Sequence, residues 1–99
     1  MDTKKMAKVF KALSNPNRLE LYFQIVKQYE ASYETDSGCL ICEISKSLNI
    51  GAPTISHHLK ELSNADLIFT ERKGKYLVAK VNEEMVNEVN ELLKLNNES

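Results

Sequence analysis

Two cysteines lie three positions apart, at Cys39 and Cys42, and the chain holds no others. Thiolates at such a spacing bind soft metal ions or metalloids, or form a disulfide that responds to oxidation. Two thiols are an incomplete shell for zinc or arsenite, so water, Asp36, Glu43 or a second chain would have to complete it. Alternatively, both are small apolar residues with no sensing role. The residues leave metal binding, redox switching and simple packing open.

A second group of chemically useful side chains lies in residues 51–62. At 100° per residue, Ile55, Leu59 and Leu62 fall within one apolar arc of a helix. The opposite side carries short polar and basic residues: Thr54, Ser56, His57 and Lys60. A surface helix of this kind, closely preceded by another short helix, is how a helix-turn-helix presents side chains to the major groove of DNA. We therefore expect these four residues to contact bases or phosphates.

The two histidines of this helix have different expected roles. His57 faces outward and is expected to donate to a base or a phosphate, more strongly once protonated. His58 lies at the edge of the apolar arc, which favours a packed, hydrogen-bonded histidine over a metal ligand. Because adjacent helical residues point 100° apart, the pair does not form a metal site.

The rest of the chain reads as elements that position this helix. Apolar periodicity predicts helices over 3–13, 16–29, 40–48 and 51–62, strands over 67–71 and 76–81, and a final helix after Asn82. Two helices have extended core stripes: Met6, Val9, Phe10 and Leu13 in the first, and Leu19, Tyr22, Phe23, Val26 and Tyr29, broadened by Leu21 and Ile25, in the second. Asn49 is expected to end the third helix in a left-handed conformation.

The two strands predict a hairpin directly after the helix-turn-helix. Its turn, residues 72–75, contains Gly74, which is free to adopt positive φ, and three basic residues expected near flanking phosphates or the minor groove: Arg72, Lys73 and Lys75. The predicted fold is mainly α with a β-hairpin wing, a winged helix-turn-helix with five helices in the order α-α-α-α-β-β-α. We expect a single DNA-binding domain over residues 1–99.

The last helix carries an apolar stripe that no later segment covers: Met85, Val86, Val89, Leu92 and Leu93. We expect it to pair with the same helix or the first helix of a second copy, giving a homodimer.

The net charge of −1 conceals an uneven distribution along the 99 residues. Residues 1–11 carry four lysines and one aspartate, residues 53–80 have five basic and three acidic residues, and residues 81–99 have one lysine and five glutamates. The basic excess lies around the helix of residues 51–62, here called the reading helix, and it permits a nucleic-acid partner. There is neither an apolar run of membrane-spanning length nor a signal-peptide core in residues 1–11, so a cytoplasmic protein with no membrane partner is expected.

Five segments together resemble one family. They are Ala12–Leu21 (ALSNPNRLEL), Cys42–Ile44, Pro53–Leu62 (PTISHHLKEL), Ala65–Ile68 and Glu71–Lys75. In this order, over roughly residues 6–82, the chain resembles the ArsR/SmtB family of repressors. The resemblance implies a homodimeric winged-helix repressor that binds a palindromic operator in double-stranded DNA and is released by a metal ion, a metalloid or a redox signal.

The chain departs from that family at three places. Cys42 matches the second cysteine of the family's Cys-x-Cys metalloid site, but the first falls on Leu40, so the spacing here is Cys-x-x-Cys. Gly51 and Ala52 replace a common Ser-Gln pair, which removes an amide that could bind adenine. No histidine follows His58, so the family's Asp/His metal site on the last helix is not expected.

Other functions remain as alternatives. The same surface could belong to a winged-helix protein-interaction module, or to a DNA-binding regulator without cysteine-based sensing. A thiol oxidoreductase is disfavoured because no thioredoxin-like strand precedes Cys39 and no catalytic base is apparent. We expect no enzyme activity and no certain cofactor, with a thiolate-bound metal or metalloid ion as the candidate ligand.

Overall fold

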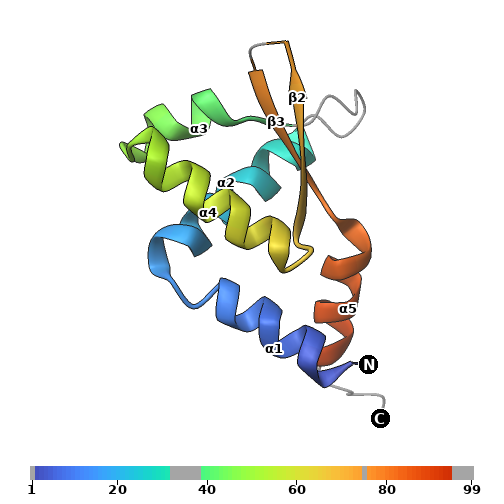
Figure 1. The fold of residues 1–99 in the computed structure, drawn as a ribbon. Coiled ribbons are helices and arrows are strands. Elements are labelled where there is room, and N and C mark those ends of the chain that lie inside the picture. Colours follow the sequence, from blue (N-terminus) through green and yellow to red (C-terminus); the bar gives the residue numbers. More distant parts are fainter. Residues whose placement is uncertain (1, 32–38, 75, 95–99) are drawn as a thin grey trace.

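The computed structural model describes residues 2–31, 39–74 and 76–94 (Figure 1). The elements are α1 (Thr3–Ala12), α2 (Pro16–Ala31), β1 (Cys39–Leu40), α3 (Ile41–Leu48), α4 (Ala52–Asn64), β2 (Ile68–Lys73), β3 (Tyr76–Val81) and α5 (Glu83–Leu93). They confirm the mainly helical winged helix-turn-helix with its hairpin. The predicted order omitted β1, a two-residue strand that is defined by its pairing with β3 rather than by local sequence.

Polar side chains and left-handed residues set the ends of these helices. Asp2 accepts hydrogen bonds from the Lys4 and Lys5 amides at the start of α1, and Asn82 accepts from the Met85 amide at the start of α5. Asn49, at φ 54°, ends α3 as predicted. The predicted stop at Asn49 is therefore confirmed, and the final helix begins directly after Asn82 as predicted.

The sheet has the order β1-β3-β2, and both pairings are antiparallel. In the hairpin, Ile68 lies opposite Val81 and Lys73 lies opposite Tyr76. Gly74 has φ +63°, so it supplies the conformation that the turn needs. β2 extends to Lys73, two residues beyond the predicted strand, because the ladder continues almost to the turn.

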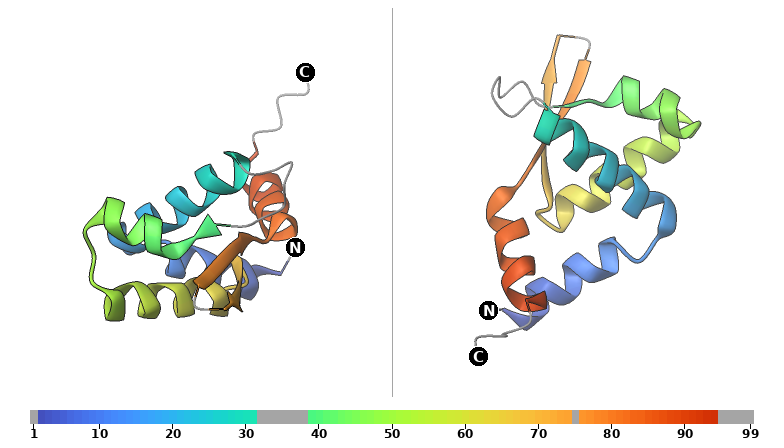
Figure 2. Two further views of the ribbon diagram at one scale, coloured as in Figure 1. Left: turned by 90° about the horizontal axis from the view of Figure 1, so that it is seen from above. Right: turned by 180° about the vertical axis from the view of Figure 1, so that it is seen from behind.

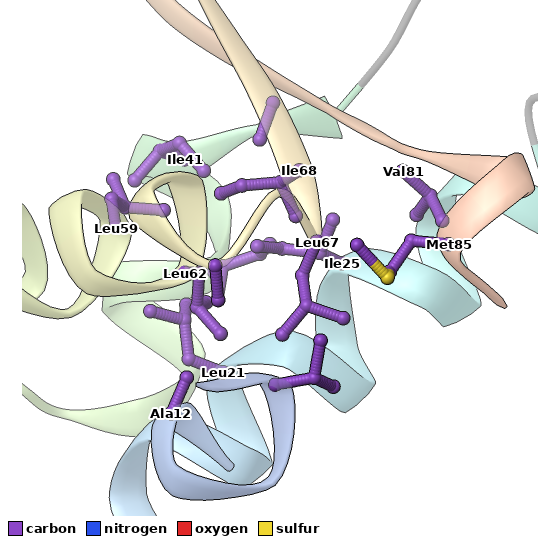
Figure 3. Packing of buried hydrophobic residues seen from close by; sticks show 14 of the residues in the cluster. Ala12, Leu21, Ile25, Ile41, Leu59, Leu62, Leu67, Ile68, Val81 and Met85 are labelled. Carbon is purple, nitrogen blue, oxygen red and sulfur yellow. The ribbon is translucent and has the colours of Figure 1, made fainter. Parts of the chain in front are cut away.

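The core lies where α1, α2, α3, α4 and the hairpin meet. Figure 3 shows Leu62 of α4 directed toward Leu21 of α2, with Val81 and Met85 close together at the hairpin's exit. Leu21, Ile25, Ile44 and Leu62 are fully buried. Viewed from above in Figure 2, α4 lies along one side of the molecule and α2 toward the other. This packing leaves the outer side of α4 uncovered.

The prediction of which residues of α1 and α2 face the core was partly wrong. On α2, Leu21 and Ile25 form the buried edge, whereas Leu19 and Phe23 are 47% and 53% exposed. Tyr22 and Val26 are partly buried, and the Tyr29 side chain lies outside the described part. Apolar residues on α2 occupy more than one side of the helix, so the sequence allows either side to face inward. Packing against β3, α3 and α4 selects one of them.

On α1, Met6, Val9 and Ala12 are buried, Leu13 is partly buried, and Phe10 is 39% exposed. Of the α5 stripe that was expected to lie uncovered, Met85 is buried, Val86, Val89 and Leu92 are partly buried against this chain's own core, and Leu93 is 62% exposed. Lys5 and Glu88 join the two helices by an ion pair of 2.8 Å. In the described segments, no helix is long and apolar enough to cross a membrane.

Candidate nucleic-acid interface

Helix α4 divides into a buried apolar face and an exposed polar face. Ile55, Leu59 and Leu62 are at most 3% exposed. The four residues predicted to meet DNA are all exposed: Thr54, Ser56, His57 and Lys60. Gly51 is the N-cap in extended conformation and offers no side-chain cap, and Pro53 in the first turn loses no helical hydrogen bond. The polar face is therefore held firmly by the opposite side of the same helix.

A short link fixes α4 relative to α3. Residues 49–51 separate the two helices, and the left-handed Asn49 turns the chain at their junction. Ile41 and Ile44 of α3 are buried in the same core as Ile55 and Leu59. Both helices thus share one apolar anchor, as a helix-turn-helix requires.

The hairpin lies beside α4 and extends away from the core (Figure 1). Arg72 and Lys73 are exposed near its tip, opposite Leu77 and Tyr76. Lys75 falls outside the described residues. Two of the three predicted wing cations therefore lie on an exposed strand next to the reading helix.

A groove between α4 and the hairpin brings Ser56 and Lys60 together with polar residues that were not predicted to contact DNA. It is lined by Ser56, Leu59, Lys60, Ser63, Asn64, Thr70 and Leu77. Asn64 lies four residues after Lys60 and seven after His57, so it shares their helical face. The helical period would have identified Asn64 if the helix had not been predicted to end at Leu62.

His58 is buried, at 5% exposed, as expected for a packed histidine. Arg18 of α2 donates from Nε to Nδ1 of His58 at 3.4 Å, and from Nη1 to the Ala12 carbonyl of α1 at 3.2 Å. One guanidinium thus joins α1, α2 and α4. This contact could not be predicted from local sequence because Arg18 and His58 are 40 positions apart.

This environment favours the neutral form of His58. Burial lowers the pKa of His58 below its ordinary value of 6.5, and the charges of Arg18 and then His57 lower it further. With Nδ1 accepting from Arg18, the neutral ring carries its proton on Nε2. That Nε2 is buried, and it has no hydrogen-bond partner within the described part of the chain.

The cysteine prediction falls on side chains that the structure does not describe. By backbone, Cys39 lies in β1, opposite Ala79 of β3, and Cys42 lies in the first turn of α3. Among the residues that are described, no group of three or more His, Cys, Asp or Glu is placed to hold a metal ion. The two thiols remain a prediction.

Helix α4 has a buried apolar face and an exposed polar face. It is linked tightly to a preceding helix and is flanked by a basic hairpin. This arrangement defines a winged helix-turn-helix DNA-binding protein. Comparisons with known proteins agree. Residues 36–69 match the model of the arsR family of bacterial regulatory proteins. The transcriptional repressor SdpR of Bacillus subtilis is 34% identical over 77 residues, which cover 78% of this chain and 76% of that protein.

Two further comparisons cover nearly the whole chain. The arsenical resistance operon repressor of Staphylococcus xylosus is 26% identical over 99 residues, covering 100% of this chain and 86% of that protein. The solved homodimeric winged helix-turn-helix DNA-binding domain from Mycobacterium bovis matches with a TM-score of 0.66 at 18% identity, covering 95% of this chain and 87% of that one. The chain belongs to the arsR family of bacterial regulatory proteins. It is a DNA-binding transcriptional regulator and not an enzyme.

Proposed function

We propose that this chain is a homodimeric repressor that places α4 of each copy in the major groove of a palindromic operator. The observation that carries the proposal is the exposed polar face of α4 beside a fully buried apolar face. A dimer would read two half-sites about one helical turn, or a multiple of it, apart.

Base recognition then rests on a small set of side chains. With Ala52 in place of an amide, Thr54, Ser56 and His57 carry the hydrogen bonds to base edges, and Lys60 binds a base or a phosphate. The wing cations Arg72, Lys73 and Lys75 bind the flanking backbone or minor groove. Thr54 and Ser56 each offer a hydroxyl that can donate or accept, so they suit several bases.

The dimer is proposed to form through α1 and α5. Phe10 and Leu93 expose apolar surface on these helices, and the structural neighbour from Mycobacterium bovis is homodimeric. A second copy would remove these side chains from water, at roughly 25 cal/mol for each Å² of apolar surface buried.

Release from DNA is proposed to depend on Cys39 and Cys42, either through a thiol-reactive metal or metalloid or through oxidation. The repressor of Staphylococcus xylosus belongs to an arsenical resistance operon, which favours the metalloid. The two thiolates would supply soft ligands for such an ion. β1, which contains Cys39, pairs with β3, and β3 continues toward the wing at one end and α5 at the other, so a change at the thiols has a direct route to both.

The DNA proposal is tested by measuring affinity for DNA from the protein's own promoter and for random DNA of equal length. We expect a clear preference for the promoter, and His57→Ala should reduce that preference by about 1–2 kcal/mol. Glu20→Ala, an exposed change on α2, is the matched control. Equal affinity of the wild-type protein for both DNAs would refute the proposal. A partner recovered in a nuclease-treated pull-down would instead favour a protein-interaction module.

The switch is tested by replacing both cysteines with serine. The double variant should bind the promoter with unchanged affinity, yet no longer dissociate when arsenite, cadmium or oxidant is added. Absorbance of the thiolate–metal bond, followed in the same titration of wild-type protein, separates metal binding from oxidation. Normal release by the double variant would eliminate both thiol mechanisms and leave a regulator without cysteine-based sensing.

A further inference from the structure

A second polar cleft lies on the opposite side of α4 from the hairpin. It has a volume of about 540 Å³ and lies between α1, the turn into α2 and the carboxyl end of α4. Its lining is Lys8, Lys11, Ala12, Ser14, Asn15, Arg18, Glu61, Asn64 and Ala65. Three of these residues are cationic and one is anionic, so the cleft is positively charged although the chain as a whole is not.

The lysines of α1 differ in what they contact. Lys5 is paired with Glu88 at 2.8 Å. Lys8 and Lys11 are exposed, and neither forms an ion pair within the described residues. Arg18 lies deeper, with its guanidinium bonded to Ala12 and His58, and so adds a fixed positive charge. Glu61 is hydrogen-bonded to the Asn64 amide at 3.5 Å. Glu61 is thus the single carboxylate in a lining that holds three cations, and it forms no ion pair with Lys8 or Lys11.

The cleft continues the surface that is proposed to read DNA. Asn64 lines both this cleft and the groove beside the hairpin, and it shares a helical face with His57 and Lys60. Figure 1 shows α1 along one flank of α4 and the hairpin along the other, and both contact α4. A helix in the major groove, about 12 Å wide, has a sugar-phosphate backbone on each flank. The hairpin serves only one of them.

We propose that the cleft between α1 and α4 binds the phosphate backbone on the second flank, through Lys8 and Lys11 with Asn15 and Asn64 beside them. Lysine and asparagine side chains are common phosphate ligands, and such contacts fix the register of a protein on the duplex without reading sequence. This inference deepens the proposed function by assigning a DNA contact to α1, a helix otherwise assigned to dimerisation.

The test uses the slope of log affinity against log salt concentration, because each phosphate neutralised by a cation contributes about −0.9. In Lys8→Gln/Lys11→Gln, we expect the slope to become shallower by about 1 for each lysine lost from each bound chain. The ratio of promoter to random-DNA affinity should stay unchanged, because both duplexes present the same phosphates. Lys8→Arg/Lys11→Arg should retain the wild-type slope.

Lys94→Gln is the matched control, since it removes one exposed positive charge after the end of α5. An unchanged slope in Lys8→Gln/Lys11→Gln, or an equal change per charge in Lys94→Gln, would overturn the inference. The outcome is separate from that of the proposed function. Salt dependence on random DNA tests the cleft even if the wild-type protein shows no promoter preference, and a preference that His57→Ala reduces stands even if the slope does not move.

Discussion

Two regions of this molecule expose different kinds of side chain. Around α4 and the hairpin, the exposed residues are mostly short, polar or basic, with Phe69, at 57% exposed, as the aromatic exception. On α1, α2 and α5, large apolar side chains reach water: Phe10, Leu19, Phe23 and Leu93, each at least 39% exposed. The first region suits a polyanion, whereas the exposed apolar side chains of the second suit another apolar surface.

The two regions obtain their stability from different sources. The polar face of α4 rests on a core already complete within one chain, because Leu59 and Leu62 are buried by their own domain. Burying a large apolar side chain is worth about 1.5–3 kcal/mol, and on α1 and α5 the side chains of Phe10 and Leu93 are still 39% and 62% exposed in the single chain. We therefore expect mutations in the two regions to separate folding, dimerisation and DNA binding.

The largest expected effect is on folding, at the buried face of α4. Leu62→Ala should lower the free energy of unfolding by about 3 kcal/mol, because a fully buried leucine leaves a cavity that closes only in part. Urea denaturation measures it. Lys60→Ala, two residues away on the exposed face, should change the free energy of unfolding by less than about 0.5 kcal/mol and weaken DNA binding instead. Equal destabilisation by both changes would contradict the division of α4 into two faces.

A smaller effect is expected on dimerisation. Phe10→Ala should weaken the proposed dimer by about 2 kcal/mol, since a two-fold interface loses the same aromatic contact from both copies. That corresponds to roughly a 30-fold higher dimer dissociation constant, measurable by sedimentation. Phe69→Ala is the matched control, an aromatic truncation at an exposed position of the hairpin. A similar loss in the control, or none in Phe10→Ala, would remove α1 from the interface.

Most of the fold could be predicted because local chemistry determines it. Asn49 and Asn82 mark helix ends through conformations and hydrogen bonds that need only neighbouring residues. Gly74 marks the turn for the same reason. The alternation of faces on α4 follows from a single period, so Ile55 and His57 were assigned to the correct sides.

What was missed depends on contacts between distant segments. Packing of α2 against β3, α3 and α4 decides that Leu21 rather than Phe23 faces inward, and β1 exists through its pairing with β3. Helix α4 ends at Asn64, but its end was predicted two residues earlier, at Leu62, because residues 63–66 resemble a break. The chain turns only at Asp66, which has a left-handed conformation. The bond from Arg18 to His58 and the cleft at Lys8 and Lys11 needed the packing of α1 and α2 against α4.

The smallest expected effect is on the pH dependence of folding, and it arises from His58. This residue of α4 accepts a hydrogen bond from Arg18 of α2, so it connects the two regions, and its ring centroid lies 6.0 Å from that of His57. Because the pKa of His58 is lowered in the folded chain, the unfolded chain binds a proton first as pH falls below about 6.5. The free energy of unfolding should therefore decrease from pH 6.5 down to the folded pKa, with no contribution from this group above pH 6.5.

Urea denaturation across pH 7.5 to 5, with NMR titration of both histidines, measures this contribution. His58→Gln should remove the part of the pH dependence that begins near 6.5, whereas His57→Gln, on the exposed neighbour, should retain it. Protonation would place Nδ1–H against the Arg18 donor, so the contact between α2 and α4 should weaken over the same range. If His58→Gln and wild-type protein lose stability in parallel, the buried imidazole is not the group responsible, and Arg18 tolerates a charged ring beside it.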